Sequence, residues 1–167
     1  FVLDREEEVT IEKPKLWNIR GYGKPNLYKI KVSLISNGKV VETKTIKYGI
    51  RKVELKRSSV VKKGGKFEFH INGKKVFLLG SNWVPIEAIK HIDDERMLKT
   101  LDMLVDLNCN CIRVWGGGTY ESDLFYEKCD ELGILVWQDF MMGCAVYPQV
   151  EEFQNRLREE VVHIVKH

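Results

Sequence analysis

The strongest constraint on the fold is a change of rhythm along the chain near residue 76. Before this point apolar and polar residues alternate over short runs, which is typical of half-buried strands, and no helical pattern appears before residue 90. After it, short apolar runs alternate with longer segments whose apolar residues recur at helical spacing. Strands that alternate with helices pair in parallel through right-handed crossovers. The chain is therefore predicted to join an all-β part to an α/β part.

The α/β part is expected to contain three strand–helix units. Its helices are predicted to begin near residues 93, 121 and 150, and the second should end at Gly133, because glycine commonly follows the last turn of a helix. Three such units fit either the start of a closed barrel or an open doubly wound sheet, and periodicity does not separate the two. The strands are predicted at residues 76–79, 111–114 and 134–137.

The all-β part is expected to contain two hairpins. Asn37-Gly38 and Asn72-Gly73 each separate two strand-like runs. Asn-Gly favours a two-residue type I′ turn, because both central residues of that turn need a positive φ. Both hairpins should therefore have tight turns at these positions.

The distribution of charge also divides the chain in two. Residues 1–75 contain 19 Lys and Arg against 8 Asp and Glu, a balance of +11, whereas residues 76–167 contain 8 against 16, a balance of −8. A basic nucleic-acid-binding half is one interpretation, but the lysines alternate along strand-like runs as on a solvated face, and no nucleic-acid motif accompanies them. We expect an incomplete β-sandwich domain at residues 1–57, a linker at 58–66 and the α/β domain at 67–167.

Several classes of protein are disfavoured by what the sequence lacks. It contains no apolar run near the roughly 18 residues that a membrane helix needs, and no targeting signal is visible, so a cytoplasmic location is expected. Its four cysteines form no C-x-x-C pair and have no histidine at zinc-site spacing, so we expect reduced thiols and no metal or cofactor.

The residues most suited to binding a ligand follow the three predicted strands of the α/β part. Ligands of α/β folds sit at the carboxyl ends of the strands, and each end here carries hydrogen-bonding side chains. Amide and charged groups can pair with sugar hydroxyls, and indole rings can pack on the apolar face of a pyranose. The combination predicts a sugar site. Its candidate residues are Asn82, Trp83, Arg113, Trp115, Gln138 and Asp139.

Structural interpretations of the same residues remain open. A tryptophan at a strand end often belongs to the core, and Arg113 could be an ion-pair partner, with Asp139 as the nearest candidate. Residues 116–118 are three glycines between a strand and a helix, but G-x-G-x-x-G and G-K-[ST] are both absent, which argues against a phosphate-binding loop. We expect these glycines to allow a tight turn beneath a bound ring.

Five blocks of the sequence resemble glycoside hydrolase family 2, and three of them are similar to its β-mannosidase branch. Trp17 opens a W-x-x-x-G-Y-G-x-x-x-L-Y pattern found in the second domain of the family, and residues 69–80 resemble its entry into the barrel. The β-mannosidase-like blocks contain G-S-N-W-V-P, R-V-W-G-G-G and V-W-Q-D-F, and Tyr147-Pro148 also fits that branch. The resemblance covers nearly the whole chain.

This resemblance implies a fold: the C-terminal part of an immunoglobulin-like β-sandwich followed by the first three βα units of a (β/α)₈ TIM barrel. It also implies a retaining mechanism with two glutamates, an acid/base at the end of strand four and a nucleophile at the end of strand seven. Both positions lie outside this chain. Arg113 matches the position that holds the nucleophile ionised and oriented. The positions implied to line the sugar subsite are Asn82, Trp83, Trp115, Gln138 and Asp139, with Glu87 where the family usually has Asp.

The expected function is that of a fragment of an exo-glycosidase that hydrolyses terminal β-D-mannose residues from oligosaccharides or glycoconjugates, with neither nucleic acid nor membrane as a partner. Alone, the fragment is expected to be inactive and prone to aggregate, because the rest of its barrel would be needed to cover its open edges. Two alternatives remain: a non-catalytic carbohydrate-binding or scaffold module, and a family 2 hydrolase of a β-galactoside, β-glucuronide or β-glucosaminide.

Overall fold

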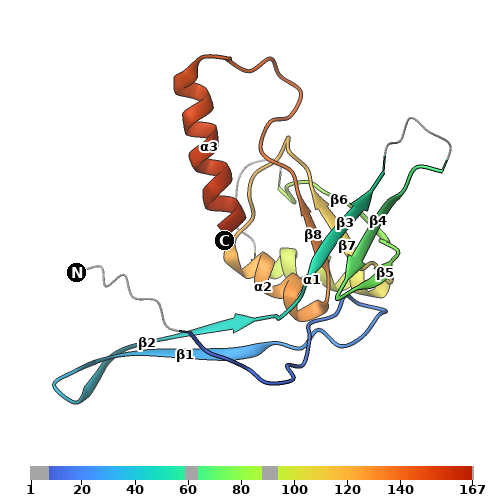
Figure 1. The fold of residues 1–167 in the computed structure, drawn as a ribbon. Coiled ribbons are helices and arrows are strands. Elements are labelled where there is room, and N and C mark those ends of the chain that lie inside the picture. The colour runs from blue at the N-terminus through green and yellow to red at the C-terminus, as the bar shows by residue number, and fades with distance from the viewer. Residues whose placement is uncertain (1–7, 59–63, 88–93, 167) are drawn as a thin grey trace. The chain divides into compact units, whose positions relative to one another are not determined.

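The fold was obtained as a computed structural model, which describes residues 8–58, 64–87 and 94–166 (Figure 1). The chain forms two compact units, Phe1–Phe77 and Leu78–His167. The strands described in the first unit all pair antiparallel, and the second unit contains parallel strands alternating with helices. The predicted succession of an all-β part and an α/β part is therefore observed.

The first hairpin of the first unit joins β1 (Tyr28–Ser36) to β2 (Lys39–Tyr48). Asn37 and Gly38 form its turn with φ values of 50° and 73°, so both residues adopt the left-handed conformation that the Asn-Gly pair predicted. The register shifts between Leu34 and Ile35, which marks a bulge near the turn.

The second sheet of the first unit has the strand order β3-β4-β5, with β3 at Val53–Arg57, β4 at Phe67–Ile71 and β5 at Lys74–Val76. Its β4–β5 turn again uses positive φ, 51° at Asn72 and 79° at Gly73.

This sheet contains strands from both sides of the predicted linker. The predicted linker, residues 58–66, connects two strands that pair with each other, β3 and β4; residues 59–63 lie outside the described part of the chain. The two compact units divide between Phe77 and Leu78 instead. The polar, glycine-containing composition of residues 58–66 suggested a linker, but backbone pairing joins the strands on its two sides.

Trp17, the first residue of the W-x-x-x-G-Y-G pattern, anchors the core of the first unit. Its side chain is fully buried, and its backbone carbonyl accepts a hydrogen bond from Asn72 Nδ2 at 2.8 Å. The guanidinium of Arg51 lies 4.5 Å from the indole centroid, and a Cβ on Gly49 would come within 2.9 Å of the ring. The first residue of the pattern is therefore a packing residue, with the Arg51 guanidinium over its indole and the bare backbone of Gly49 against it.

The second unit is built on a parallel sheet with the order β6-β7-β8 (Figure 1). The strands are β6 (Gly80–Trp83), β7 (Cys111–Val114) and β8 (Leu135–Gln138). The helices are α1 (Asp94–Asp106), α2 (Asp123–Leu132) and α3 (Glu151–Lys166). Gly133 directly follows the last residue of α2 with a φ of 73°, which confirms the glycine predicted to terminate this helix.

The first parallel strand begins later than expected. The apolar run at 76–79 was predicted to form it, but Val76 ends β5 and the parallel strand is the more polar Gly80–Trp83. Leu79 instead accepts backbone hydrogen bonds from Asn110 and Cys111 at 2.8 and 3.0 Å. The side chain of Asn110, only 4% exposed, in turn accepts one from the Leu79 amide. Asn110 thus brings the chain into register just before β6 begins.

The core of the second unit lies between the sheet and helices α1 and α2. Leu101 and Phe125 are fully buried and pack with side chains from all three strand regions. None of the described residues of α3 is buried. The cluster consists of Trp83, Met97, Leu101, Leu104, Ile112, Val114, Phe125, Cys129 and Ile134.

Candidate functional site at the ends of the parallel strands

The register of the parallel sheet places three polar or aromatic side chains in one row. Asn82 of β6 is opposite Arg113 of β7, which is opposite Trp137 of β8. Successive side chains of a strand point to opposite faces. Because Trp83 and Val114 are buried in the core with the helices, their neighbours Asn82 and Arg113 face the other side of the sheet. The row Asn82–Arg113–Trp137 therefore lies on the face that the helices leave open.

Arg113 and Asp139 form the central contact of this face. The guanidinium donates from Nη2 to Asp139 Oδ2 at 2.6 Å and from Nε to Asp139 Oδ1 at 3.2 Å. It also donates from Nη1 to Asn82 Oδ1 at 3.3 Å. The Arg113 side chain is 43% exposed, and Asp139 is 21% exposed. The ion pair that the sequence left open is thus formed, while Nη1 and Nη2 each carry a second N–H that can reach a ligand.

Trp83 lies in the core of the unit. It is 5% exposed, its ring centroid is 5.0 Å from that of Phe125, and its Nε1 donates to Glu121 Oε1 at 2.8 Å. The structure therefore offers no exposed indole at this predicted subsite position. Trp83 supports the end of β6 from the helix side instead.

Trp115 and the three glycines after it form a closely packed loop. A Cβ on Gly117 would collide with the Trp115 ring, and one on Gly118 would lie 2.9 Å from Pro85 Cδ. A Cβ on Gly116 would lie 2.5 Å from the carbonyl oxygen of Phe140. The glycines therefore let the loops after β6, β7 and β8 approach one another, and the ring that covers Gly117 is the half-buried indole of Trp115 itself.

Gln138 and Glu87, two other predicted site residues, are bonded within the unit. Gln138 Oε1 accepts a hydrogen bond from Tyr126 Oη at 2.6 Å, and its Nε2 donates to the backbone oxygen of Asp139 at 2.7 Å. Glu87 forms a salt bridge with Arg96 of α1. Both side chains are partly exposed, so their contacts with the protein are established and contact with a ligand stays a prediction.

Tyr120 ties together two loops that follow the parallel strands, a role that the sequence analysis did not predict. Its hydroxyl donates to Glu160 Oε1 of α3 at 2.7 Å and accepts from the amide of Met141 at 3.3 Å. Burial, with a further contribution from Glu160, raises the pKa of Tyr120 to about 12. The neutral hydroxyl thus joins the loop after β7, the loop after β8 and α3, and no short motif signalled this.

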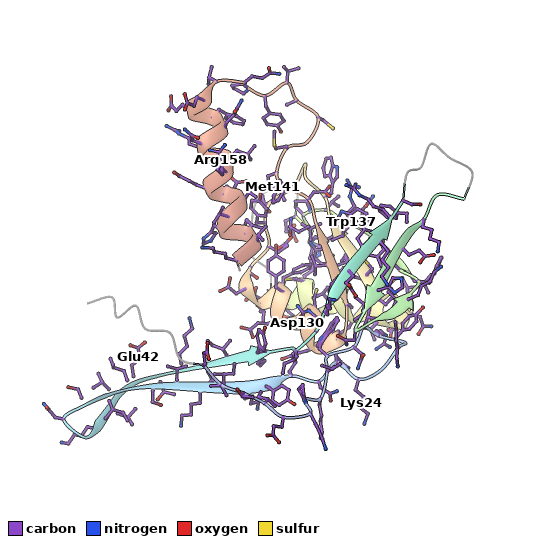
Figure 2. The ribbon with its side chains drawn as sticks, in the orientation of Figure 1. Lys24, Glu42, Asp130, Trp137, Met141 and Arg158 are labelled. Carbon is purple, nitrogen blue, oxygen red and sulfur yellow. The ribbon has the colours of Figure 1, made fainter. Side chains whose placement is uncertain are left out.

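Trp137 is the second missed residue, and here a signal was present. It is 43% exposed on β8, and Figure 2 labels it. It lies two positions before Asp139, so the period of two along a strand predicts that both project to the same face. Of the tryptophans at the strand ends, Trp137 is the one in the same row as Arg113.

The described part of the chain shows no grouping of three or more His, Cys, Asp or Glu side chains that could hold a metal ion. Within the same residues, no helix has the length and apolar character needed to cross a membrane.

The fold and this face are those of α/β proteins, whose ligand sites commonly lie at the carboxyl ends of parallel strands. Comparison with known proteins adds a family likeness. Residues 2–51 match the family model described as glycosyl hydrolases family 2. Together with the relatives below, this match makes the chain similar to glycoside hydrolase family 2, and its sequence is β-mannosidase-like.

The relatives cover nearly all of this chain. A β-mannosidase from Capra hircus is 44% identical over 152 residues, which are 90% of this chain and 17% of that protein. The crystal structure of a β-D-mannosidase from Dictyoglomus thermophilum matches with a TM-score of 0.81 and 47% identity, over 91% of this chain and 19% of that one. A β-glucuronidase from Parabacteroides merdae matches with a TM-score of 0.71 and 26% identity, over 89% and 17%. The chain thus spans less than a fifth of the length of these relatives.

Proposed function

We propose that this chain is part of a longer retaining glycoside hydrolase that removes terminal β-D-mannose residues from oligosaccharides or glycoconjugates. The observation that carries this proposal is the Asn82–Arg113 pair on the open face of the sheet, in a chain 44–47% identical to β-mannosidases over about nine-tenths of its length. In the longer protein the first unit would complete an immunoglobulin-like β-sandwich, and the parallel sheet would be the first three strands of a (β/α)₈ barrel.

Arg113 is proposed to hold the nucleophilic carboxylate. A retaining glycosidase needs one carboxyl group ionised as nucleophile and a second, about 5–5.5 Å away, as acid/base. A guanidinium beside the nucleophile favours its ionised form and fixes its orientation through paired hydrogen bonds. Two N–H groups of Arg113 beyond those bonded to Asn82 and Asp139 could make these bonds. Both carboxyl groups would come from parts of the longer protein outside these 167 residues.

The sugar itself is proposed to meet the open face beside Arg113. Asn82 offers an amide for hydroxyl groups, and Trp137 and Trp115 offer indole surface for the apolar face of a pyranose. Gln138 and Glu87 would contribute only if the sugar displaced or shared their present partners, Tyr126 and Arg96.

The first alternative is a family 2 hydrolase that acts on another β-glycoside. The match of this fold to a β-glucuronidase at 26% identity supports it. A non-catalytic carbohydrate-binding module is the second alternative, since the open face could bind a sugar without the two carboxylates.

The test is the hydrolysis of aryl β-mannoside, β-galactoside, β-glucuronide and β-glucosaminide by the full-length protein, with the 167-residue chain measured beside it. We expect cleavage of the mannoside by the full-length protein and no cleavage by the chain alone. A preference for another glycoside would refute the mannosidase assignment. Binding without hydrolysis of any substrate would support the non-catalytic module, and hydrolysis by the chain alone would contradict the two-carboxylate mechanism.

A further inference from the structure

We infer that Asp139 is a positioning residue for Arg113 and not a ligand of the sugar. This inference rests on the proposed function, because it assigns a role within the same site. The sequence placed Asp139 among residues that line the subsite, whereas the contacts in the structure direct its carboxylate toward the protein.

The lone pairs of the Asp139 carboxylate are largely occupied by protein donors. Oδ2 accepts from Arg113 Nη2 at 2.6 Å and from the amide of Gly116 at 3.2 Å, and Oδ1 accepts from Arg113 Nε at 3.2 Å. A carboxylate has about four acceptor positions, two on each oxygen. A sugar hydroxyl would therefore find one position on Oδ1 and would have to displace a charge-assisted bond to gain a second.

The backbone on both sides of this carboxylate is held in place. The amide of Asp139 donates to the carbonyl of Val114 at 3.1 Å, which continues the β7–β8 ladder one step beyond the strands. The amide of Gly116 reaches Oδ2 from the loop after β7, and a Cβ on Gly116 would lie only 3.2 Å from Asp139 Cβ and 2.5 Å from the oxygen of Phe140. Glycine at 116 is thus what allows the loop backbone to approach the carboxylate.

The consequence for Arg113 is a fixed guanidinium plane. Asp139 holds the edge formed by Nε and Nη2, and Asn82 accepts from Nη1, so these bonds restrict rotation of the guanidinium about Cδ–Nε. A two-bond, fork-like contact sets the orientation of an arginine in a way that a single charge contact does not. The half-exposed guanidinium can then present its remaining N–H groups in one direction, toward the open face.

The experiment is a double-mutant cycle in the full-length protein, with kcat and KM measured on the aryl glycoside that it cleaves. In Asp139→Asn one of the three donors would face an amide NH₂ group in place of an oxygen. We expect kcat to fall about 10- to 100-fold with KM nearly unchanged, as expected when a catalytic group is misaligned. In an Arg113→Lys background, which has no fork to orient, the same change should lower kcat less than about 3-fold further. Asp102→Asn, on the exposed side of α1, is the matched control and should leave both constants unchanged.

Two results would overturn the inference. One is a large rise in KM for Asp139→Asn with kcat retained. The other is a kcat of the double variant that is lowered by the full product of the losses in Asp139→Asn and Arg113→Lys. If Asp139→Asn does not fold, Asp139→Glu, which keeps the charge and moves it by one methylene, replaces it in the cycle with the same expectations. A wild-type protein that cleaves none of the glycosides would overturn the proposed function and this inference together, whereas an active wild type with multiplying effects would overturn the inference alone.

Discussion

Replacement of Trp83 by phenylalanine should loosen the end of β6 and leave sugar binding nearly unchanged. In the structure the indole is 5% exposed, packs against Phe125 and donates from Nε1 to Glu121 at 2.8 Å. Phenylalanine retains an aromatic ring in the core but cannot donate, so the partly buried Glu121 carboxylate would lose this hydrogen bond.

The expected size of the effect follows from these contacts. A hydrogen bond to a charged group contributes about 1.5–3 kcal/mol, and the smaller ring also buries less apolar surface. A local loss of about 2–3 kcal/mol corresponds to opening that is about 30- to 150-fold more frequent. Glu121→Gln is the matched control, because the side-chain amide keeps an oxygen that can accept from Trp83 and should cost less than about 1 kcal/mol.

Amide hydrogen exchange measures this opening within the full-length protein, in peptides that cover β6 and the start of α2. We expect faster exchange in both peptides for Trp83→Phe, little change for Glu121→Gln, and a KM for the aryl glycoside within a few-fold of wild type. Unchanged exchange together with a strongly raised KM would refute the reasoning, because it would mean that the indole meets the sugar and not the core.

Three further experiments test other parts of the second unit. Gly117→Ala should cost about 1–3 kcal/mol because its Cβ would overlap the Trp115 ring; a variant with the melting temperature of wild type would contradict this placement of the indole. At pH 8 an alkylating reagent should modify exposed Cys144 and spare Cys129 until denaturant is added, because burial raises the pKa of the Cys129 thiol to about 12. Peptide mass spectrometry measures the labelling of each cysteine, and equal rates at the two residues would argue against the burial of Cys129. Burial raises the pKa of Tyr120 from an ordinary value of 10 to about 12, so the contribution of this hydroxyl to stability is complete below pH 10 and is lost as the pH rises through 12. The difference in unfolding free energy between wild type and Tyr120→Phe, measured by urea unfolding, should therefore be constant below pH 10 and shrink between pH 10 and 12.

The local features that the sequence predicted correctly are those in which neighbouring residues decide the backbone conformation. Asn37-Gly38 forms a tight turn because these two residues tolerate positive φ better than others, whatever surrounds them. The end of α2 at Gly133 has the same origin. Strand β7 was predicted with its observed bounds, since a short apolar run between turn residues leaves few alternatives.

The start of the parallel sheet could not be predicted in this way. Residues 76–79 form the more apolar run, yet the pairing partner of β7 is Gly80–Trp83, which contains two polar residues. The start of the parallel strand depends on the backbone hydrogen bonds that Asn110 and Cys111 donate to Leu79, and these bonds join segments about 30 positions apart in the sequence. The pairing of β3 with β4 across the predicted linker has the same kind of cause.

The sequence by itself determined the resemblance to glycoside hydrolase family 2, the succession of strands and helices, and the presence of polar and aromatic residues at three strand ends. Only the tertiary structure decided which of these side chains are exposed. Trp83 and Trp137 are both tryptophans at strand ends, but one strand position faces the helices and the other faces away, so Trp83 is buried and Trp137 is 43% exposed. Likewise, Arg113 and Asp139 meet because the register aligns β7 with β8. The physical reason is that residue type and spacing are local properties, whereas the buried face of a sheet is set by the helices that pack on it.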